Sequence, residues 1–212
     1  MIELGLKFTA AYLLGSVLGS LIVGYLRGGV DIRRVGSGNP GGTNALRTQG
    51  KAFAFWVMLI DVGKGIAAVT VLPNLELFGF AIDPGLGRDL VLYSVAFAAI
   101  LGHVYPLWYD FKGGKGGATA IGILCILAPA AAAVAIAIWI AIIALTGYVG
   151  LATMTGAVAA AAYVGATGLP GDVGLFAFTV ATAVLIVYTH RANIRRMRDG
   201  TEVRMGMLRR IR

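Results

Sequence analysis

Charged residues are scarce in this sequence. Only 13% of its 212 residues are Asp, Glu, Lys or Arg, and 58% are hydrophobic, whereas soluble domains carry about 25% charged residues. This shortage excludes a disordered chain, and the composition is typical of a protein embedded in a membrane. The net charge of +8 is therefore interpreted through membrane topology, and no nucleic-acid partner is expected.

Cysteine and histidine are almost absent. The single cysteine, Cys125, lies in an apolar run, which excludes a disulfide within the chain and any CxxC metal or redox motif. Only His103 and His190 can serve as a histidine base near neutral pH. The polar loops contain no cluster of carboxylates of the kind that Mg²⁺ prefers, so neither a metal nor a cofactor is expected.

Long apolar runs make up much of the sequence. Phe8–Tyr25, Ala52–Leu72 and Leu90–Tyr109 are each long enough to cross a bilayer as one helix. The GxxxG spacing of Gly15 and Gly19 predicts a packing face on the first of these helices.

The stretch from Ala118 to Thr189 carries one charge, Asp172. Breaker clusters at Pro129, 146–150 and 165–171 divide it into four pieces, the first of them short. An even number of spans is required because both flanks are basic. The sequence therefore predicts an all-α integral membrane protein with seven transmembrane helices, and five is the alternative.

Basic residues indicate the sidedness of these spans. The segments 26–51, 110–116 and 190–212 hold 15 of the 18 Lys and Arg residues, whereas 1–7 and 73–89 carry more acids than bases. Short loops rich in Lys and Arg stay in the cytoplasm. We therefore expect an external N-terminus and a cytoplasmic C-terminus.

Three polar loops fall on the predicted cytoplasmic side: the first loop (35–47), the second loop (111–119) and the third loop (190–195). The first two combine glycines with Lys or Arg and with Ser, Thr or Asn. Glycine lets the backbone adopt positive φ and direct several N–H groups to one point, forming an anion-binding nest. Both loops run into apolar segments, so their ends are expected at helix N-termini, which favour anions. The pattern predicts a ligand with one or two phosphate groups.

Further polar residues lie within or beside the apolar runs. Asp61 and Lys64 stand at positions i and i+3 of one helix face. Such an intramembrane pair indicates either support of a polar site or a structural ion pair. His103 is either a packing residue or part of the site. His190, three residues before Asn193, is the better candidate for a base because its neighbours are polar.

The glycine-rich loops allow two other interpretations. The segment 36–41 fits the GxGxxG dinucleotide pattern, but a membrane helix precedes it in place of a strand, which excludes a Rossmann fold. A transporter for a phosphorylated solute is the competing function, since charged intramembrane groups and glycine-broken helices serve transport too. Three loops on one side favour an enzyme, because alternating access requires a site near the midplane.

Three motifs carry a resemblance to a known family. They read GSGNPGGTNALRTQG (36–50), KGGKGGAT (112–119) and THRANIRR (189–196), and their order and spacing extend over essentially the whole chain. The sequence resembles the bacterial PlsY family of acyl-phosphate:glycerol-3-phosphate acyltransferases. The resemblance implies a seven-helix protein that forms a single polytopic domain over residues 1–212. Ala192 stands where the family often has Glu, and Gly117 where it often has Val.

Site residues are expected in all three loops. Lys112 and Lys115 would hold the acyl phosphate, and Arg47, Arg195 and His190 would gather the glycerol 3-phosphate. The expected catalytic residues are Ser37, Lys115, His190 and Asn193. The expected substrate-binding residues carry charge, hydrogen-bonding groups or a close backbone approach: Gly38, Asn39, Gly41, Thr43, Asn44, Arg47, Lys64, His103, Lys112, Gly113, Gly114, Gly116, Thr119 and Arg195.

The resemblance implies transfer of a fatty acyl group from acyl phosphate to the 1-hydroxyl of glycerol 3-phosphate. The products would be lysophosphatidic acid and phosphate, in the first acylation step of phospholipid synthesis. Acyl phosphate is already activated and no nucleophile elbow is present, so direct attack without an acyl-enzyme is expected. The proton would pass to His190 or to a substrate phosphate oxygen. The expected setting is a monomer in the bacterial cytoplasmic (inner) membrane, in contact with membrane lipid, with its active site facing the cytoplasm.

Overall fold

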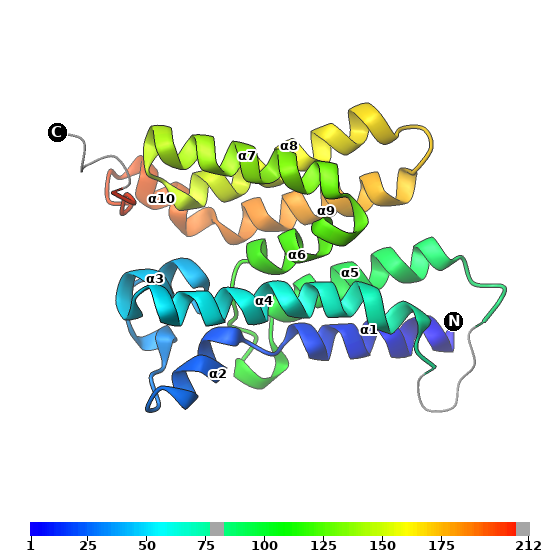
Figure 1. Cartoon of the computed structure of the whole chain (residues 1–212), viewed down its shortest axis with the longest axis horizontal. Helices are drawn as coiled ribbons and strands as arrows, with labels where there is room; N and C mark the ends of the chain where they lie inside the picture. Colours follow the sequence, from blue (N-terminus) through cyan, green and yellow to red (C-terminus); the bar gives the residue numbers. More distant parts are fainter. Residues whose placement is uncertain (77–82, 207–212) are drawn as a thin grey trace. The chain divides into compact units, whose positions relative to one another are not determined.

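The computed structural model describes residues 1–76 and 83–206, and every regular element in these ranges is a helix (Figure 1). The chain folds as two compact units, unit 1 (Met1–Leu127) and unit 2 (Ala128–Arg212), which are described separately. The all-helical fold class that the composition predicts is thus found throughout the described residues.

Unit 1 is built around one long helix, α4, which contacts α1, α2, α3, α5 and α6. A second extensive contact runs between α1 and α5. Three short 3₁₀ helices, η1 (Ile32–Arg34), η2 (Leu72–Asn74) and η3 (Leu107–Tyr109), lie in the connections. The α-helices among the described residues of unit 1 are α1 (Ile2–Gly15), α2 (Gly19–Leu26), α3 (Gly42–Gln49), α4 (Lys51–Val71), α5 (Arg88–Val104) and α6 (Gly117–Leu127).

The first predicted span is broken in the structure. α1 ends at Gly15, α2 begins at Gly19, and the two helices are bent by 43°. A Cβ on Gly15 would collide with the backbone of Ala99 in α5, whereas one on Gly19 would press on Val57 in α4. Both glycines therefore allow close packing, as their spacing predicts, and the break turns them toward two different helices.

Unit 2 consists of α7 (Pro129–Thr146), α8 (Val149–Gly168), α9 (Val173–Thr189) and the short α10 (Arg191–Arg198). Helix α8 contacts α7, α9 and α10. These boundaries confirm the breaker clusters predicted from the sequence. The segment after α10 returns to the α7–α8 turn, where the N–H of Met205 donates to the carbonyl of Gly147 at 2.7 Å.

Several helices have the length and composition of membrane spans. In the part of the chain that the structure describes, four qualify individually: α4 with η2, α5 with η3, α7 and α8. The bent pairs α1–α2 and α9–α10 raise the number to six if each pair is one span. Helix α6 is apolar but has only 11 residues. Membrane-spanning helices are therefore present by length and composition, while the number seven stays a prediction.

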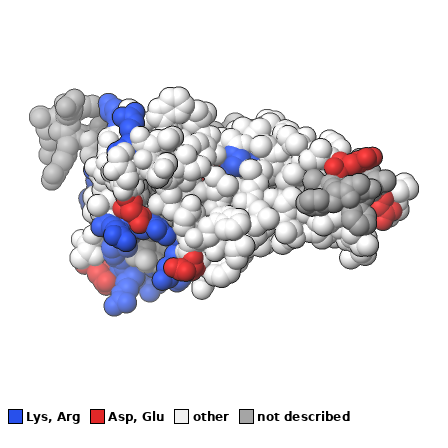
Figure 2. Space-filling model, turned by 90° about the horizontal axis from the view of Figure 1, so that it is seen from below, with Lys and Arg blue, Asp and Glu red and all other residues white. Residues whose placement is uncertain are grey.

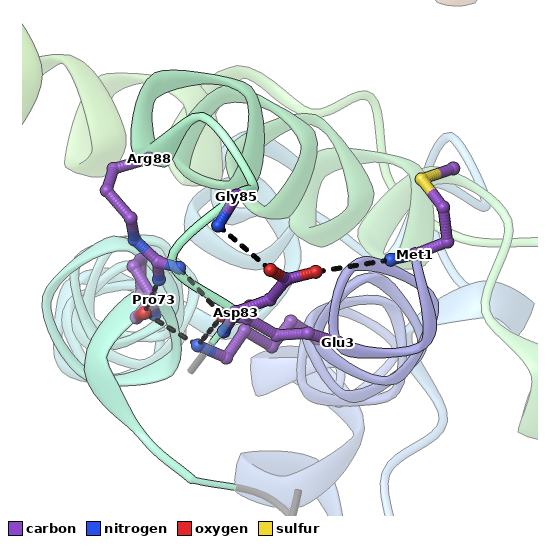
Figure 3. A network of polar contacts seen from close by, with 7 residues as sticks. Met1, Glu3, Pro73, Asp83, Gly85 and Arg88 are labelled. Carbon is purple, nitrogen blue, oxygen red and sulfur yellow. Dashed lines mark hydrogen bonds and ion pairs between the residues drawn. The ribbon is translucent and has the colours of Figure 1, made fainter. Parts of the chain in front are cut away.

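One end of unit 1 is closed by a network of polar contacts, here called the N-terminal network (Figure 3). Lys7 Nζ donates to Glu3 Oε1 at 2.6 Å and to the carbonyl of Pro73 at 2.7 Å. Arg88 donates to the same two partners, at 2.8 Å in the case of Glu3. The N–H of Asp83 donates to Glu3 Oε2 at 2.8 Å. These contacts tie the start of α1 to the segments before and within α5.

The charges of unit 1 are divided between its two ends. On the face displayed in Figure 2, Lys and Arg gather at the end where α2 and α3 lie, and the opposite end shows mainly Asp and Glu. The basic end carries the first and second loops, so the candidate site lies where the cations are concentrated.

Candidate functional site

Asn44 holds the first loop in shape. Its Oδ1 accepts from the N–H of Ser37 at 3.0 Å, and its Nδ2 donates to the carbonyls of Ile32 and Val35 at 3.2 and 2.9 Å. The residue is only 3% exposed. Because its amide satisfies loop backbone groups, Asn44 fixes where the neighbouring Ser37 lies.

The first loop turns sharply before it enters α3. Gly36 and Gly38 have φ of 60° and 73°, which side chains rarely tolerate. Ser20, at the start of α2, donates to the carbonyl of Pro40 at 3.0 Å and anchors the loop to the bundle. Ser37 and Arg47 are exposed, and Asn39, Gly41 and Thr43 are half-buried. Helix α3 begins at Gly42, so the predicted helix N-terminus after this loop is found.

The second loop is fastened to the end of α5 by its backbone. The N–H of Gly113 donates to the carbonyl of Val104 at 3.1 Å, and that of Gly114 to the carbonyl of His103 at 2.9 Å. A Cβ on Gly114 would collide with the His103 ring. Glycine is therefore required at this position for the loop to lie against the histidine.

The remaining predicted residues of the second loop differ in exposure. Lys112 is exposed and Lys115 is half-buried, whereas Thr119 is fully buried and its hydroxyl has no hydrogen-bond partner among the described residues. Gly116 takes a φ of 86° directly before α6 begins at Gly117. The predicted helix N-terminus after the second loop is thus also found.

A pocket of about 350 Å³ opens between the first and second loops. This volume lies within the range of about 300–1,000 Å³ that small-molecule sites occupy. The structure brings three predicted residues together here, Gly38, Lys112 and Gly113. The lining also includes Asp31, Arg33, Arg34, Pro40, Tyr109 and Asp110.

Arg33 is held in place at this pocket. Its guanidinium donates to both carboxylate oxygens of Asp31 at 3.0 and 2.9 Å, and it lies 5.3 Å from the centre of the Tyr109 ring. The hydrogen bonds from Arg33 hold the pKa of Asp31 below its usual value, and the same contact raises the pKa of Arg33. A permanent cation therefore stands at the pocket in a fixed orientation. The sequence analysis missed Arg33, although its place two residues after an acid in a basic segment was a signal.

A buried polar cluster, consisting of Asp61, Lys64 and His103, lies inside unit 1. Lys64 Nζ is 3.0 Å from Asp61 Oδ1 and 2.7 Å from His103 Nδ1. The three side chains are 1%, 3% and 3% exposed. The predicted i, i+3 pair is confirmed, and the histidine from α5 joins it.

His190 occupies the junction between α9 and α10 and is 5% exposed. Its Nδ1 lies 2.7 Å from the carbonyl oxygen of Ile186. A carbonyl only accepts, so this nitrogen carries the hydrogen. In the neutral ring Nε2 is then the proton-accepting nitrogen, as a base requires.

Asn193 is held between α8 and the segment after α10. Its Nδ2 donates to Glu202 Oε1 at 2.7 Å, and Arg196 Nε donates to the other oxygen of Glu202 at 2.6 Å. A Cβ on Gly150 would press on the Asn193 side chain. Position 192 holds Ala in place of the family's usual Glu, and the carboxylate next to Asn193 comes from Glu202, outside the third loop.

The segment predicted as the third loop is helical in the structure, because all of it after His190 lies in α10. Arg195, its last residue, is exposed and forms a loose ion pair with Asp199 at 3.8 Å. Glu202 was missed because nothing local marks it. The tail holds two acids among many arginines, Asp199 and Glu202, and residue type alone does not say which of them becomes buried against a site residue.

A family model described as glycerol-3-phosphate acyltransferase matches residues 6–200, which include all three loops. The chain belongs to this family. Glycerol-3-phosphate acyltransferases of Methylobacillus flagellatus and Rhizobium meliloti are 40% and 38% identical to it, over 93% and 96% of this chain and 94% and 96% of their own.

Solved structures agree with this membership. Two crystal structures of PlsY, an integral membrane glycerol 3-phosphate acyltransferase, match 97% of this chain and 96% of theirs. The glycerol 3-phosphate form has a TM-score of 0.81 at 36% identity, and the lysophosphatidic acid form has 0.80 at 33%. The resemblance carried by the three motifs is confirmed. This member of the glycerol-3-phosphate acyltransferase family is an integral membrane protein with several helical spans.

Proposed function

We propose that this acyltransferase uses acyl phosphate as its donor and glycerol 3-phosphate as its acceptor. The 1-hydroxyl attacks the acyl carbon, the bond to the phosphate oxygen breaks, and lysophosphatidic acid and inorganic phosphate leave. Phosphate is a good leaving group, so the enzyme needs cations and N–H donors more than a nucleophilic side chain. The reaction requires neither a cofactor nor a metal and forms no acyl-enzyme.

The pocket between the first and second loops supports this donor most directly. It combines the side chains of Arg33 and Lys112 with glycine backbone from both loops. Fixed cations and backbone N–H groups stabilise a phosphate before it departs. Lys112 and Lys115 hold the acyl phosphate, Arg47 and Arg195 gather the acceptor, and Ser37 and Asn193 orient the reacting groups.

His190 is the proposed base. The hydrogen bond from its Nδ1 to Ile186 assigns the hydrogen to that nitrogen, which supports proton acceptance at Nε2. A substrate phosphate oxygen is the alternative acceptor of the proton. Substitutions of the proposed site residues in either unit should therefore lower activity.

The proposed setting is a monomer that works as a single domain in the bacterial cytoplasmic (inner) membrane, in contact with membrane lipid. The six possible spans and the short α6 support seven membrane segments. The positive-inside rule supports an external N-terminus and a cytoplasmic site and C-terminus.

The donor is tested with the purified protein in detergent micelles and radiolabelled glycerol 3-phosphate. Palmitoyl phosphate, palmitoyl-CoA and palmitoyl acyl carrier protein are supplied in parallel. We expect labelled lysophosphatidic acid from palmitoyl phosphate only. Product formed from the CoA or carrier-protein thioester at a similar rate would refute the proposed donor. Product formation in micelles, where no compartment is sealed, also separates the enzyme from the transporter.

The site and the direct attack are tested in the same assay. Lys115→Ala and Arg47→Ala should each lower kcat/KM by about 100-fold, because each removes a charged contact to a phosphate. Near-wild-type transfer by both folded variants would show that the loops are assigned wrongly. A labelled acyl chain found covalently on the protein would refute direct attack.

A further inference from the structure

The buried polar cluster satisfies the backbone at the break in the first span. Residues between α1 and α2 leave the helical hydrogen-bonding pattern, and unsatisfied backbone groups are costly inside a membrane. Lys64 Nζ donates to the carbonyl of Val17 at 2.7 Å, and the N–H of Gly19 donates to Asp61 Oδ1 at 3.2 Å. One charged pair on α4 thus provides both the donor and the acceptor that this break requires.

The hydrogens of Lys64 are fully used by protein atoms. An ammonium has three, and Val17 O, Asp61 Oδ1 and His103 Nδ1 lie 2.7, 3.0 and 2.7 Å from Nζ. Because an ammonium cannot accept, Nδ1 of His103 must accept, and the neutral ring carries its hydrogen on Nε2. Lys64 therefore has no N–H left to donate to a substrate.

The buried polar cluster is connected to both glycine-rich loops, to the first through Gly19 and Ser20 and to the second through His103. On one side, Gly19 is followed by Ser20, which donates to the carbonyl of Pro40 in the first loop. On the other side, the carbonyl of His103 accepts from Gly114 in the second loop, and its ring packs against that glycine. The cluster is thus connected to both walls of the pocket by short paths of hydrogen bonds.

We propose that Asp61, Lys64 and His103 are positioning residues that fix the first and second loops relative to each other. This inference rests on the proposed function for its kinetic consequence only. In this proposal the three side chains act through the loops, in place of the substrate contacts that were expected of Lys64 and His103 from the sequence. The cluster sets the spacing of the phosphate-binding groups by holding the α1–α2 break and the end of α5 against α4. A small displacement of such groups costs much of the rate even when the substitution is remote.

The N-terminal network offers a matched control. Lys7 has the same chemistry as Lys64: it lies on a helix of unit 1, is 2% exposed, pairs with a buried carboxylate and donates to a backbone carbonyl. It lies at the end of unit 1 away from the glycine-rich loops. Lys64→Met and Lys7→Met therefore remove equivalent buried cations, and only the first breaks the connection to the loops.

The double variant Asp61→Asn/Lys64→Met distinguishes an effect of Lys64 on folding stability from an effect on the position of the loops. It removes the carboxylate that Lys64→Met would leave unpaired, and the new amide oxygen still accepts from Gly19. If Lys64 acted through stability alone, the double variant would recover activity. Under the proposal it stays defective, because Val17 and His103 have still lost their donor.

The experiment measures melting temperature, kcat and KM, and hydrogen–deuterium exchange of peptides from the first and second loops in detergent. We expect Lys64→Met and the double variant to lower kcat/KM by about 100-fold and to raise exchange in both loops. Lys7→Met should lower the melting temperature while both other readouts stay at wild-type values.

Wild-type loop exchange and wild-type kcat/KM in the folded double variant would overturn the proposal, whatever its melting temperature. Equal kinetic losses in Lys7→Met and Lys64→Met would overturn it as well. Exchange does not depend on the acyl donor, so a wild-type protein that rejects acyl phosphate would refute the proposed function and leave this inference testable.

Discussion

Glu202 fixes the orientation of a predicted site residue. A carboxylate only accepts, so the amide nitrogen of Asn193 must face it and the amide oxygen must point elsewhere. Arg196 balances the charge of the buried acid from the other side. An asparagine that orients a reacting group in this way needs one defined rotamer, and Glu202 together with Gly150 provides it.

Glu202→Leu should therefore impair both stability and catalysis. Loss of two hydrogen bonds to a buried carboxylate costs about 2 kcal/mol of stability, and freedom of the Asn193 amide should lower kcat by about 10-fold. Thermal melts and steady-state kinetics measure the two effects. Asp199→Asn, in the same segment but exposed, is the control and should change neither. A stable Glu202→Leu variant with wild-type kcat would show that Asn193 needs no such support.

Asp31 should make a small pH-dependent contribution to stability. Its pKa in the folded protein is lowered, chiefly by the hydrogen bond from Arg33. The contribution is therefore complete above the unfolded pKa of about 4 and is lost as the pH falls from there through the folded value. The side chains are 25% and 34% exposed, so the effect should stay below about 1 kcal/mol.

The measurement is a series of thermal melts between pH 3 and 7 for the wild type and Asp31→Asn. Acid should destabilise both proteins through their other carboxylates, but the difference between them should shrink as the pH drops below 4. A difference that is constant over the whole range would show that the ion pair contributes nothing.

At the scale of helices, the sequence best predicts those helix ends that local residues such as proline and glycine determine. Pro129 and the glycine cluster 146–150 mark the ends of α7 and the start of α8, as found. The break after Gly15 was not predicted, and the groups that satisfy its backbone come from α4. Likewise α1 begins at Ile2, five residues before Lys7, and Lys7 is buried in this helix because Glu3 pairs with its charge.

The candidate site, like the helices, was predictable from the sequence only where local residue types decide it. Its loops, cations and glycines follow from residue type and spacing. The hydrogen bonds that hold the loops are made by Asn44 and by the carbonyl of His103. They depend on tertiary contacts, which the hydrophobic periodicity of the sequence does not reveal. Glu202 and Arg33 were missed for the same reason, because each acquires its role only through the partner that folding brings to it.

The packing of α4 against α6 gives a prediction at this scale. A Cβ on Gly65 would collide with the carbonyl of Thr119, two residues into α6, whereas a Cβ on Gly63 meets nothing within 4 Å. Gly65→Ala should push α6 away, displace Lys115, which lies two residues before α6, and cost about 1–3 kcal/mol of stability. Gly63→Ala should be neutral or slightly stabilising, because alanine favours a helix.

Melting temperature and kcat/KM of the two alanine variants measure this difference. The same substitution, two residues apart on one helix, controls for helix propensity and expression. Equal behaviour of Gly63→Ala and Gly65→Ala would show that the close approach of α4 and α6 is not needed for the site.

At the scale of the whole molecule, charge distribution predicts orientation. The N-terminal network lies at the end of unit 1 where segments 1–7 and 73–89 carry more acids than bases, and the segment after α10 in unit 2 is rich in arginine. The positive-inside rule then places Gly87 outside and α10 inside.

Cysteine labelling in whole cells tests this orientation. Cys125 is first replaced by Ala, and Gly87→Cys or Arg198→Cys is then introduced at an exposed position. We expect an impermeant maleimide to label Gly87→Cys in intact cells and Arg198→Cys only after permeabilisation. The reverse pattern would contradict the proposed topology and the cytoplasmic site.

The ionic cluster on α4 also has a consequence for biogenesis. When α4 leaves the ribosome and enters the translocon, Asp61 and Lys64 have to move from water into lipid, at a cost of a few kcal/mol for each charge. The carbonyl of Val17 and the N–H of Gly19 belong to the segment synthesised earlier, so they can receive both charges at once. His103 follows later in translation. Insertion of α4 therefore depends on the break between α1 and α2. In a nascent chain that lacks this segment, α4 should fail to insert into the membrane efficiently.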